Sequence, residues 1–213
     1  MANLNSYVKC RLERALEVQE GRVPHMYQCT EGRVTIGIGH QIVSAEAAGR
    51  LNLRKQIGRD LWVDASRDEK IAEYRTIDAI TPRNNREFVN RPANSYRAST
   101  SLRMSDREMD ILRDEHISNF HRELRRRFPD FDDFPNNVQL ALFDMAFNIG
   151  MTNFSRDKWP LLHAAIDNKN WEEAARQSNR PQIGAKRNNY VRDLFLSAAR
   201  NGNVTENAAD ECR

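Results

Sequence analysis

The chain has 213 residues, of which 39% are hydrophobic and 30% are charged, so it is long enough to bury a core without covalent staples. Its formal net charge of +3 favours anionic partners, but only mildly. Three widely spaced cysteines, Cys10, Cys29 and Cys212, exclude a disulfide scaffold and a paired zinc site. At least one thiol must therefore be free or bonded to another chain.

The sequence contains no recognisable membrane or secretory segment. No stretch approaches the ~20 apolar residues of a membrane span. Residues 1–14 are interrupted by polar side chains and lack the apolar run of a secretory signal. We therefore expect a soluble protein made in the cytoplasm, which depends on another machine for any export.

The first two predicted elements are a helix and a β-hairpin. Apolar residues recur at three- and four-residue steps over residues 4–20, which predicts a helix that Gly21 ends. Alternation over residues 23–40 predicts the hairpin, with its isoleucines facing a core. The opposite face would be flat enough for a bulky ligand to approach, although a bulge or a tight bend could also explain the two glycines. Thr35, Gly37 and Gly39 are the residues of this opposite face, and Gly37 and Gly39 are its two glycines.

The middle of the chain carries weaker signals. Residues 45–104 are polar and interrupted by two prolines. One helix is predicted there, because Ser66 and Glu69 have the spacing of a capping box. The rest is expected to be rich in loops. The tryptophans are expected to pack in a core and not to bind sugars, with the exception of Trp62, which falls in this segment.

The second half of the chain is predicted to be helical. A capping pair at Ser105 opens a helix that runs to residue 128 and, at ~1.5 Å per residue, is long enough to join two lobes. The next helix has a clear apolar period and a stop at Gly150, so we place it in a core. Three shorter helices follow, and the polar tail from Arg200 is expected to be disordered. They begin at Pro160, at Asn170 and around Lys186.

Glu20 is the first residue with a chemical role to consider. It lies in the last turn of the first helix, four residues after Leu16 and therefore near the apolar face. Burial and the negative end of a helix both disfavour a carboxylate, so its pKa should be raised, as a general acid requires. From this position alone, an ordinary surface glutamate is the alternative.

The hairpin and its surroundings resemble a known family. The residues are Glu20-Gly21, Tyr27, Thr30-Glu31-Gly32 and Thr35-Ile36-Gly37-Ile38-Gly39-His40. In order, spacing and type they resemble the catalytic signature of phage-type lysozymes, the group that includes the bacteriophage T4 enzyme. Phe147-Asn148-Ile149-Gly150 is similar to the family's second cleft motif, and residues 171–175 and 185–187 also match. The resemblance covers about residues 4–44 and 105–199.

The resemblance implies an α+β, mostly helical, lysozyme-like fold with two lobes and the active site in the cleft between them. Residues 1–199 would form one lysozyme-like domain, in which helix 4–20 packs on the C-terminal lobe. The small hairpin lobe would span residues 21–104 with an insertion at about 45–104, and a tail would span 200–213. The linking helix would span 105–128, and the larger helical lobe 129–199.

The resemblance also implies an activity and a set of site residues. The family cleaves the β-1,4 bond between N-acetylmuramic acid and N-acetylglucosamine in peptidoglycan with inversion, a mechanism that pairs an acid with a carboxylate base. Glu20 would be the acid and Thr35 would position water. The substrate-binding residues would be Gly37, Gly39, His40 and Asn148, with His40 also expected to make a structural hydrogen bond or ion pair.

Cys29 departs from the family pattern, because it stands where the family has an aspartate. A thiol is neutral near pH 7 unless its pKa is depressed, and it does not position water as a carboxylate does. Our interpretation is an active enzyme in which Cys29 acts as a thiolate base or as a nucleophile that gives retention. The alternatives are that Glu31 substitutes, that the site is dead, or that the cysteine was introduced on purpose.

The remaining patterns narrow the partners. His116 and His121 are five residues apart, which does not match metal ligands on one helix face, so we predict no metal and no cofactor. The basic run 125–127 continues an amphipathic helix and favours a solvated face over nucleic-acid binding. Peptidoglycan is the expected partner of a monomeric chain. A phage endolysin would also need a membrane-permeabilising holin, and a delivered toxin could meet an immunity protein; a wall-binding module without activity is the alternative function.

Overall fold

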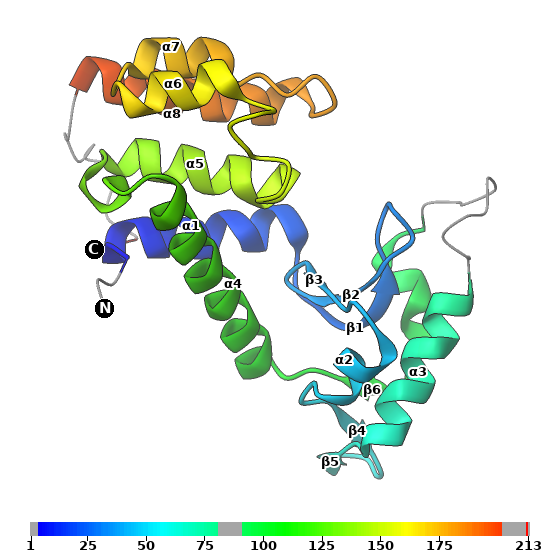
Figure 1. Cartoon of the computed structure of the whole chain (residues 1–213). Coiled ribbons are helices and arrows are strands. Elements are labelled where there is room, and N and C mark those ends of the chain that lie inside the picture. Colours follow the sequence, from blue (N-terminus) through cyan, green and yellow to red (C-terminus); the bar gives the residue numbers. More distant parts are fainter. Residues whose placement is uncertain (1–3, 81–90, 202–211, 213) are drawn as a thin grey trace. The chain divides into compact units, whose positions relative to one another are not determined.

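The computed structural model describes residues 4–80, 91–201 and 212. The predicted α+β, mostly helical class is confirmed (Figure 1). The chain divides into two compact units: a hairpin unit of residues 15–115, and a helical unit of residues 1–14 and 116–213. Helices α1 (Ser6–Glu20) and α4 (Asp106–Arg127) each contribute to both. Within the described ranges no helix is long and apolar enough to cross a bilayer.

The hairpin unit opens with a three-stranded antiparallel sheet of order β1-β2-β3. Its strands are β1 (Val23–Gln28), β2 (Val34–Gly37) and β3 (His40–Gln41). Only the first two were predicted. The third forms because Gly37 and Gly39 take φ values of 68° and 69° and turn the chain back on itself, a conformation that glycine adopts without steric cost. The glycines therefore serve a tight bend, which was the alternative explanation for them.

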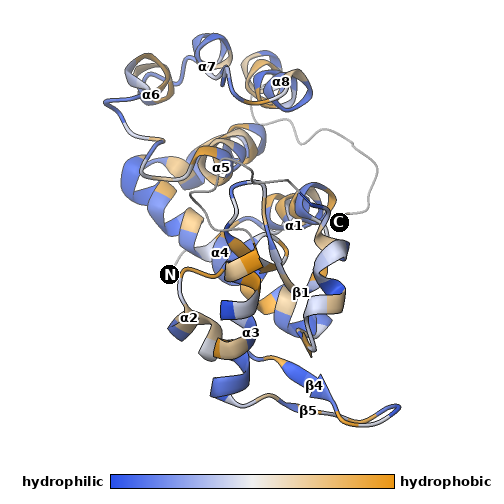
Figure 2. Cartoon of the chain, turned by 90° about the vertical axis from the view of Figure 1, so that its right-hand side faces the viewer, coloured by the Kyte–Doolittle hydropathy of each residue, from blue (hydrophilic) through white to orange (hydrophobic). Residues whose placement is uncertain are grey.

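A second antiparallel sheet lies in the segment that was expected to be rich in loops, so that expectation is wrong. Its strands, in the order β5-β4-β6, are β4 (Arg54–Gln56), β5 (Trp62–Asp64) and β6 (Leu102–Arg103). Each is two or three residues long, too short for an alternating pattern to be recognised. Figure 2 shows that β4 is hydrophilic along its length, as its sequence Arg-Lys-Gln requires.

Three further helices lie in this unit, and two of them pack on the first sheet. The three are α2 (Ala45–Gly49), α3 (Arg67–Ile80) and the 3-10 helix η1 (Ala93–Ser99). Helix α3 packs on α2 and on β1, and η1 also packs on β1. The predicted capping box of α3 is confirmed: the Glu69 backbone N donates to Ser66 Oγ at 3.3 Å, and the Ser66 backbone N donates to Glu69 Oε2 at 2.8 Å.

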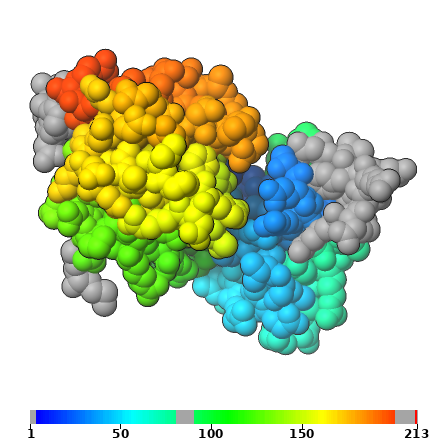
Figure 3. All heavy atoms as spheres, turned by 45° about the horizontal axis from the view of Figure 1, so that its top comes forward, coloured from blue at the N-terminus to red at the C-terminus, as the bar shows by residue number. Residues whose placement is uncertain are grey.

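The helical unit is built around α5 (Asn136–Ile149), whose buried side chains place it in a core as predicted. The short helix η2 (Phe131–Asp133) precedes it, and α6 (Pro160–Asp167), α7 (Trp171–Gln177) and α8 (Ala185–Asn201) follow. Helix α8 packs on α5 and α7, and α7 packs on α6. Figure 3 shows the last three helices as one closely packed mass from yellow to red.

The end of the chain differs from its prediction. Helix α8 continues through Asn201, so the predicted tail from Arg200 begins too early. Cys212 forms a disulfide with Cys10, and Cys29 is the free cysteine. The prediction of disorder otherwise concerns residues 202–211 and 213, which lie outside the described residues. The disulfide ties the chain end to the first part of α1 inside the helical unit.

Candidate active site

Glu20 is the last residue of α1, and its side chain is half-buried. The helix ends here because Gly21 takes a φ of 71°, which is typical of the residue that follows a helix. The Glu20 carboxyl lies against the bend between β2 and β3. A Cβ added to Gly39 would lie 3.0 Å from Glu20 Oε2 and 3.2 Å from Cδ, so only glycine leaves the carboxyl its present room.

Cys29 lies at the tip of the β1–β2 hairpin, directly after β1. The Gly32 backbone N donates to the Cys29 carbonyl at 2.8 Å, and the Cys29 backbone N donates to the Arg33 carbonyl at 2.9 Å. Gly32 takes a φ of 70° to close this turn. The backbone of Cys29 is therefore held on both sides, and the residue is half-buried and forms no disulfide.

Tyr27 lies in β1, between Glu20 and Cys29 in the chain. Burial, followed by the negative charges of Glu20 and Cys29, raises the pKa of Tyr27 to about 12. The phenol therefore stays protonated at neutral pH and can donate a hydrogen bond. Tyr27 belongs to the quoted motif but was not among the predicted site residues. Its signal in the sequence was its place in β1, two residues before Cys29.

Thr35 and Gly37 do not form the open, flat face that was predicted, and that expectation is wrong. All four residues of β2 are buried, and the exposed fraction of Thr35 is only 4%. The Thr35 hydroxyl donates to the Arg33 carbonyl at 3.0 Å. A Cβ at Gly37 would lie 3.5 Å from Met109 Cγ and 3.6 Å from Met104 Sδ, so methionines cover that side of the strand. The water-positioning role of Thr35 stays a prediction.

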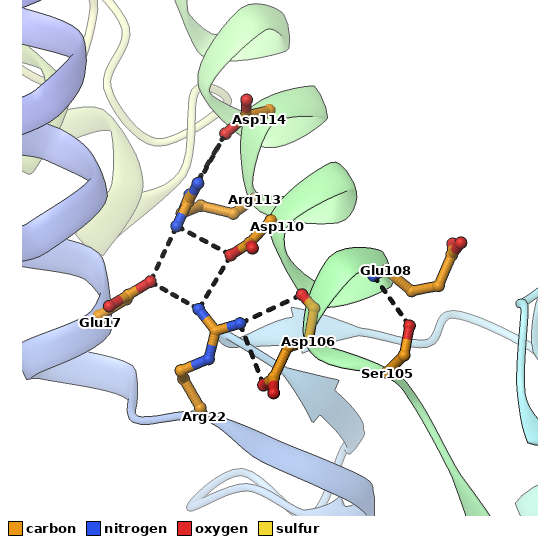
Figure 4. A network of polar contacts seen from close by, with 8 residues as sticks. All are labelled: Glu17, Arg22, Ser105, Asp106, Glu108, Asp110, Arg113 and Asp114. Carbon is orange, nitrogen blue, oxygen red and sulfur yellow. Dashed lines mark hydrogen bonds and ion pairs between the residues drawn. The ribbon is translucent and has the colours of Figure 1, made fainter.

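A network of charges flanks Glu20 within the hairpin unit (Figure 4). Arg22 Nη1 lies 2.6 Å from Glu17 Oε1 and 2.9 Å from Asp110 Oδ1, and Arg113 Nη1 lies 2.8 Å from Glu17 Oε1. Arg22 also reaches Asp106, at the start of α4, at 3.2 Å. The hydrogen bond that Arg22 donates to Asp110 is the main cause that raises the pKa of Arg22. The network therefore ties the end of α1, and with it Glu20, to the start of α4.

This network was not predicted from the sequence. Acidic and basic residues at the start of α4 are common on any solvated helix, and nothing local links them to Glu17 and Arg22, which lie about ninety residues earlier. The capping pair that opens α4 is confirmed in one direction, since the Glu108 backbone N donates to Ser105 Oγ at 3.3 Å (Figure 4).

The remaining predicted site residues, and the alternative to Cys29, lie in three separate segments of the chain. His40 is half-exposed in β3 and pairs with Ile36 across the strands. Glu31, the alternative to Cys29, is exposed and lies 3.0 Å from Arg33 in an ion pair. Asn148 belongs to the helical unit, where its Nδ2 donates to the Asp144 carbonyl at 2.8 Å and to Asp144 Oδ1 at 3.0 Å. Its substrate-binding role stays a prediction.

Among the described residues, no group of three or more His, Cys, Asp or Glu side chains could hold a metal ion, and the absence of a metal from the protein stays a prediction. His121, one of the two histidines that were considered, instead lies 2.7 Å from Asp132 Oδ1.

The contact between Gly39 and Glu20 can be tested by Gly39→Ala. The new methyl group would press on the carboxyl, and a displacement of about 1 Å in a catalytic group can lower turnover about 10²-fold. The measurement is the release of reducing ends from purified peptidoglycan. Gly21→Ala is the matched control, because Gly21 has a similar φ of 71° but nothing within 4 Å of an added Cβ. Equal losses in both variants would assign the effect to backbone strain and contradict a role for the contact.

Known proteins that are similar to this chain carry the same family name that the motif suggested. No family model matches the chain. A curated protein of Dictyostelium discoideum named "Probable T4-type lysozyme 2" is 28% identical over 189 residues, which cover 86% of this chain and 92% of the relative. "Probable T4-type lysozyme 1" of the same organism is 26% identical over 164 residues, which cover 76% of this chain and 78% of the relative. The chain is thus similar, along most of its length, to two proteins named as T4-type lysozymes.

Proposed function

We propose that this chain is a peptidoglycan hydrolase that cleaves the β-1,4 bond between N-acetylmuramic acid and N-acetylglucosamine. The observation that carries the proposal is the place of the Glu20 carboxyl at the end of α1, against the glycine bend of the hairpin. Two relatives named as T4-type lysozymes, matched over most of the chain, support it. Its place of action would be the bacterial cell wall.

In the proposed reaction Glu20 is the general acid. It gives its proton to the glycosidic oxygen as the bond from that oxygen to the anomeric carbon breaks. A water molecule attacks the anomeric carbon and loses a proton to a base, so that the sugar gains a hydroxyl group. The network around Glu17 and Arg22 holds the backbone on both sides of the acid, which limits the positions that its carboxyl can take.

Cys29 is the proposed partner of Glu20. Its backbone is held by the hairpin turn, and it forms no disulfide. As a thiolate it would take the proton from the attacking water. Alternatively, it would attack the anomeric carbon itself, and water would then release the sugar with retained configuration. Glu31 suits the role less well, because it is exposed and paired with Arg33.

The test follows the release of reducing ends from purified peptidoglycan by the full chain, with borohydride reduction to identify the sugar at each new end. We expect new N-acetylmuramic acid ends. Cys29→Ser and Cys29→Ala should lower turnover about 10²-fold or more, because they remove the base or nucleophile, whereas Cys29→Asp should keep or raise it. Thr30→Ala, at the exposed next position of the same turn, is the control and should change little. The configuration of the first product, followed by NMR, separates the base from the nucleophile.

A second function is favoured by one observation, the cysteine at the position of the family's aspartate. In that case the chain is a wall-binding module that has lost its activity. An inert starting protein that Cys29→Asp restores would show that position 29 disables the site. Inert variants throughout, with wall binding retained, would overturn the hydrolase and support the binding module.

A further inference from the structure

The hairpin unit contains a pocket of about 430 Å³ that is separate from the predicted site residues. A volume of this order is typical of small-ligand sites. Most of its wall comes from the segment of residues 45–104, and no acidic side chain lines it. The residues that matter here are Arg54, Arg97, Arg103, Trp62 and Met104. Three arginines and a tryptophan therefore face one cavity.

The arginines gather in spite of their mutual repulsion. Arg54 on β4 and Arg103 on β6 are direct partners across the two strands, a placement that destabilises a sheet when the charges are alike. Burial is the main cause that lowers the pKa of Arg103; the carboxylate of Glu73 opposes it, and the charge of Arg97 adds a smaller lowering effect. The sheet thus accepts a repulsion that an anion in the pocket would relieve.

The protein itself neutralises these arginines only in part. Arg103 donates to the backbone carbonyls of Thr100 and Leu102 at 3.1 and 2.7 Å, which orients its guanidinium without removing its charge. In the part of the chain that the structure describes, neither Arg97 nor Arg103 has a carboxylate within 4.0 Å. The Arg54 side chain lies 3.8 Å from Asp64, whose side chain is 94% exposed.

Glu73, whose charge acts on Arg103, makes hydrogen bonds through one of its oxygens, while its Oε1 is buried without a hydrogen-bond partner. Its Oε2 accepts hydrogen bonds from the backbone N of Ser101 at 2.6 Å and of Leu102 at 3.0 Å. It therefore holds the start of β6 in place on the side of α3. On the side of the pocket, no acidic side chain lines the arginine cluster.

We propose that this pocket binds an anionic oxygen group, carboxylate or phosphate, carried by a cell-wall polymer. Guanidinium groups bind both through paired N–H···O hydrogen bonds, and Trp62 offers a flat apolar surface to the carrier. Met104 lines the pocket and also packs against Gly37, so the pocket lies beside the candidate active site. The choice of a wall polymer rests on the proposed function. Stem-peptide carboxylates and teichoic phosphates are its two possible sources.

The experiment is a pelleting assay with insoluble peptidoglycan, in a Glu20→Gln background so that the glycan stays intact. Arg54→Gln combined with Arg97→Gln is compared with Arg59→Gln combined with Arg75→Gln. All four arginines are exposed and belong to the hairpin unit, and the two pairs remove equal charge, but Arg59 and Arg75 do not line the pocket. We expect the pocket pair to weaken binding about tenfold or more at low salt, and the control pair to weaken it much less.

Three wall preparations identify the group. Walls stripped of teichoic acid by hydrogen fluoride keep only the carboxylates, and stripped walls that are then amidated with carbodiimide keep neither group. Untreated walls keep both. If the pocket pair binds more weakly than the control pair on stripped walls but not on amidated walls, the ligand group is a carboxylate. If the pocket pair binds more weakly only on untreated walls, the ligand group is a phosphate. Equal binding by both pairs on every preparation, or no binding by either, overturns the proposal.

The assay also separates this inference from the proposed function. It measures binding alone, whereas hydrolysis is measured with Glu20 intact by the release of reducing ends. A chain that releases none but shows the difference between the pairs would overturn the hydrolase and leave the anion pocket standing.

Discussion

Glu20→Gln is expected to lower the rate of peptidoglycan cleavage about 10²- to 10⁴-fold, the contribution typical of a positioned general acid. Glutamine keeps the size and shape of the side chain, so the fit against Gly39 should persist while the transferable proton is lost. The initial rate of release of reducing ends measures the effect. Thermal unfolding should change little, because the substitution leaves the charge network around Glu17 intact.

Glu46→Gln is the control for this result, since Glu46 is exposed on α2 in the same unit. It should cleave at the rate of the starting protein. If Glu20→Gln keeps more than about a tenth of the rate, another group protonates the leaving oxygen and the assignment of the acid is wrong.

Arg180→Met is expected to reduce the free energy of unfolding of the helical unit by about 3–5 kcal/mol, as removal of one partner of a buried ion pair does. The Arg180 side chain is fully buried and its Nη1 lies 2.7 Å from Asp144 Oδ1, while Asp144 is 6% exposed. Two arginines contact the Asp144 carboxylate, and the substitution would leave one of them, Arg187, whose Nε lies 3.0 Å from Oδ2. Urea unfolding monitored by circular dichroism measures the loss.

Two further variants sharpen this result. Arg192→Met breaks a pair of similar length, 2.8 Å to Asp193, but both side chains are about half-exposed, so a loss of only about 0–1 kcal/mol is expected. Adding Asp144→Leu to Arg180→Met removes the buried carboxylate that has lost one of its two arginines and should recover much of the loss. A double variant as unstable as Arg180→Met would show that packing, and not the buried charge, dominates. Asp144→Leu would also remove one of the two acceptors of Asn148 Nδ2, whereas the bond to the Asp144 carbonyl would remain.

Local signals in the sequence predicted most of the helical framework. Helix α1 ends at Glu20 because Gly21 follows, and α3 begins with the reciprocal Ser66–Glu69 capping box. The helix after Asn170 begins as predicted, with the Glu173 backbone N donating to Asn170 Oδ1 at 3.0 Å. These features depend on residues within four positions of each other, so a sequence pattern contains all the information they need.

The second sheet escaped prediction because its strands are held together by partners far apart in the chain. Lys55 pairs with Leu102 across almost fifty residues, and neither strand is long enough to alternate. The arginine pocket escaped for the same reason: Arg54 and Arg103 are unremarkable as surface residues until the register sets them opposite each other. The resemblance to phage-type lysozymes leaves residues 45–104 unmatched, so it could not predict the second sheet or the arginine pocket.

Within the candidate site, the sequence by itself determined which residue types are present, their order, and the places where helix and hairpin end. Only the tertiary structure decided that Gly39 makes room for the Glu20 carboxyl, that Thr35 and Gly37 are buried, and that Cys29 is the free thiol. The physical reason is the range of the interactions involved. Caps, turns and periodic faces arise from neighbours in the chain, whereas burial, charge networks and pockets arise from the packing of segments that the sequence keeps apart.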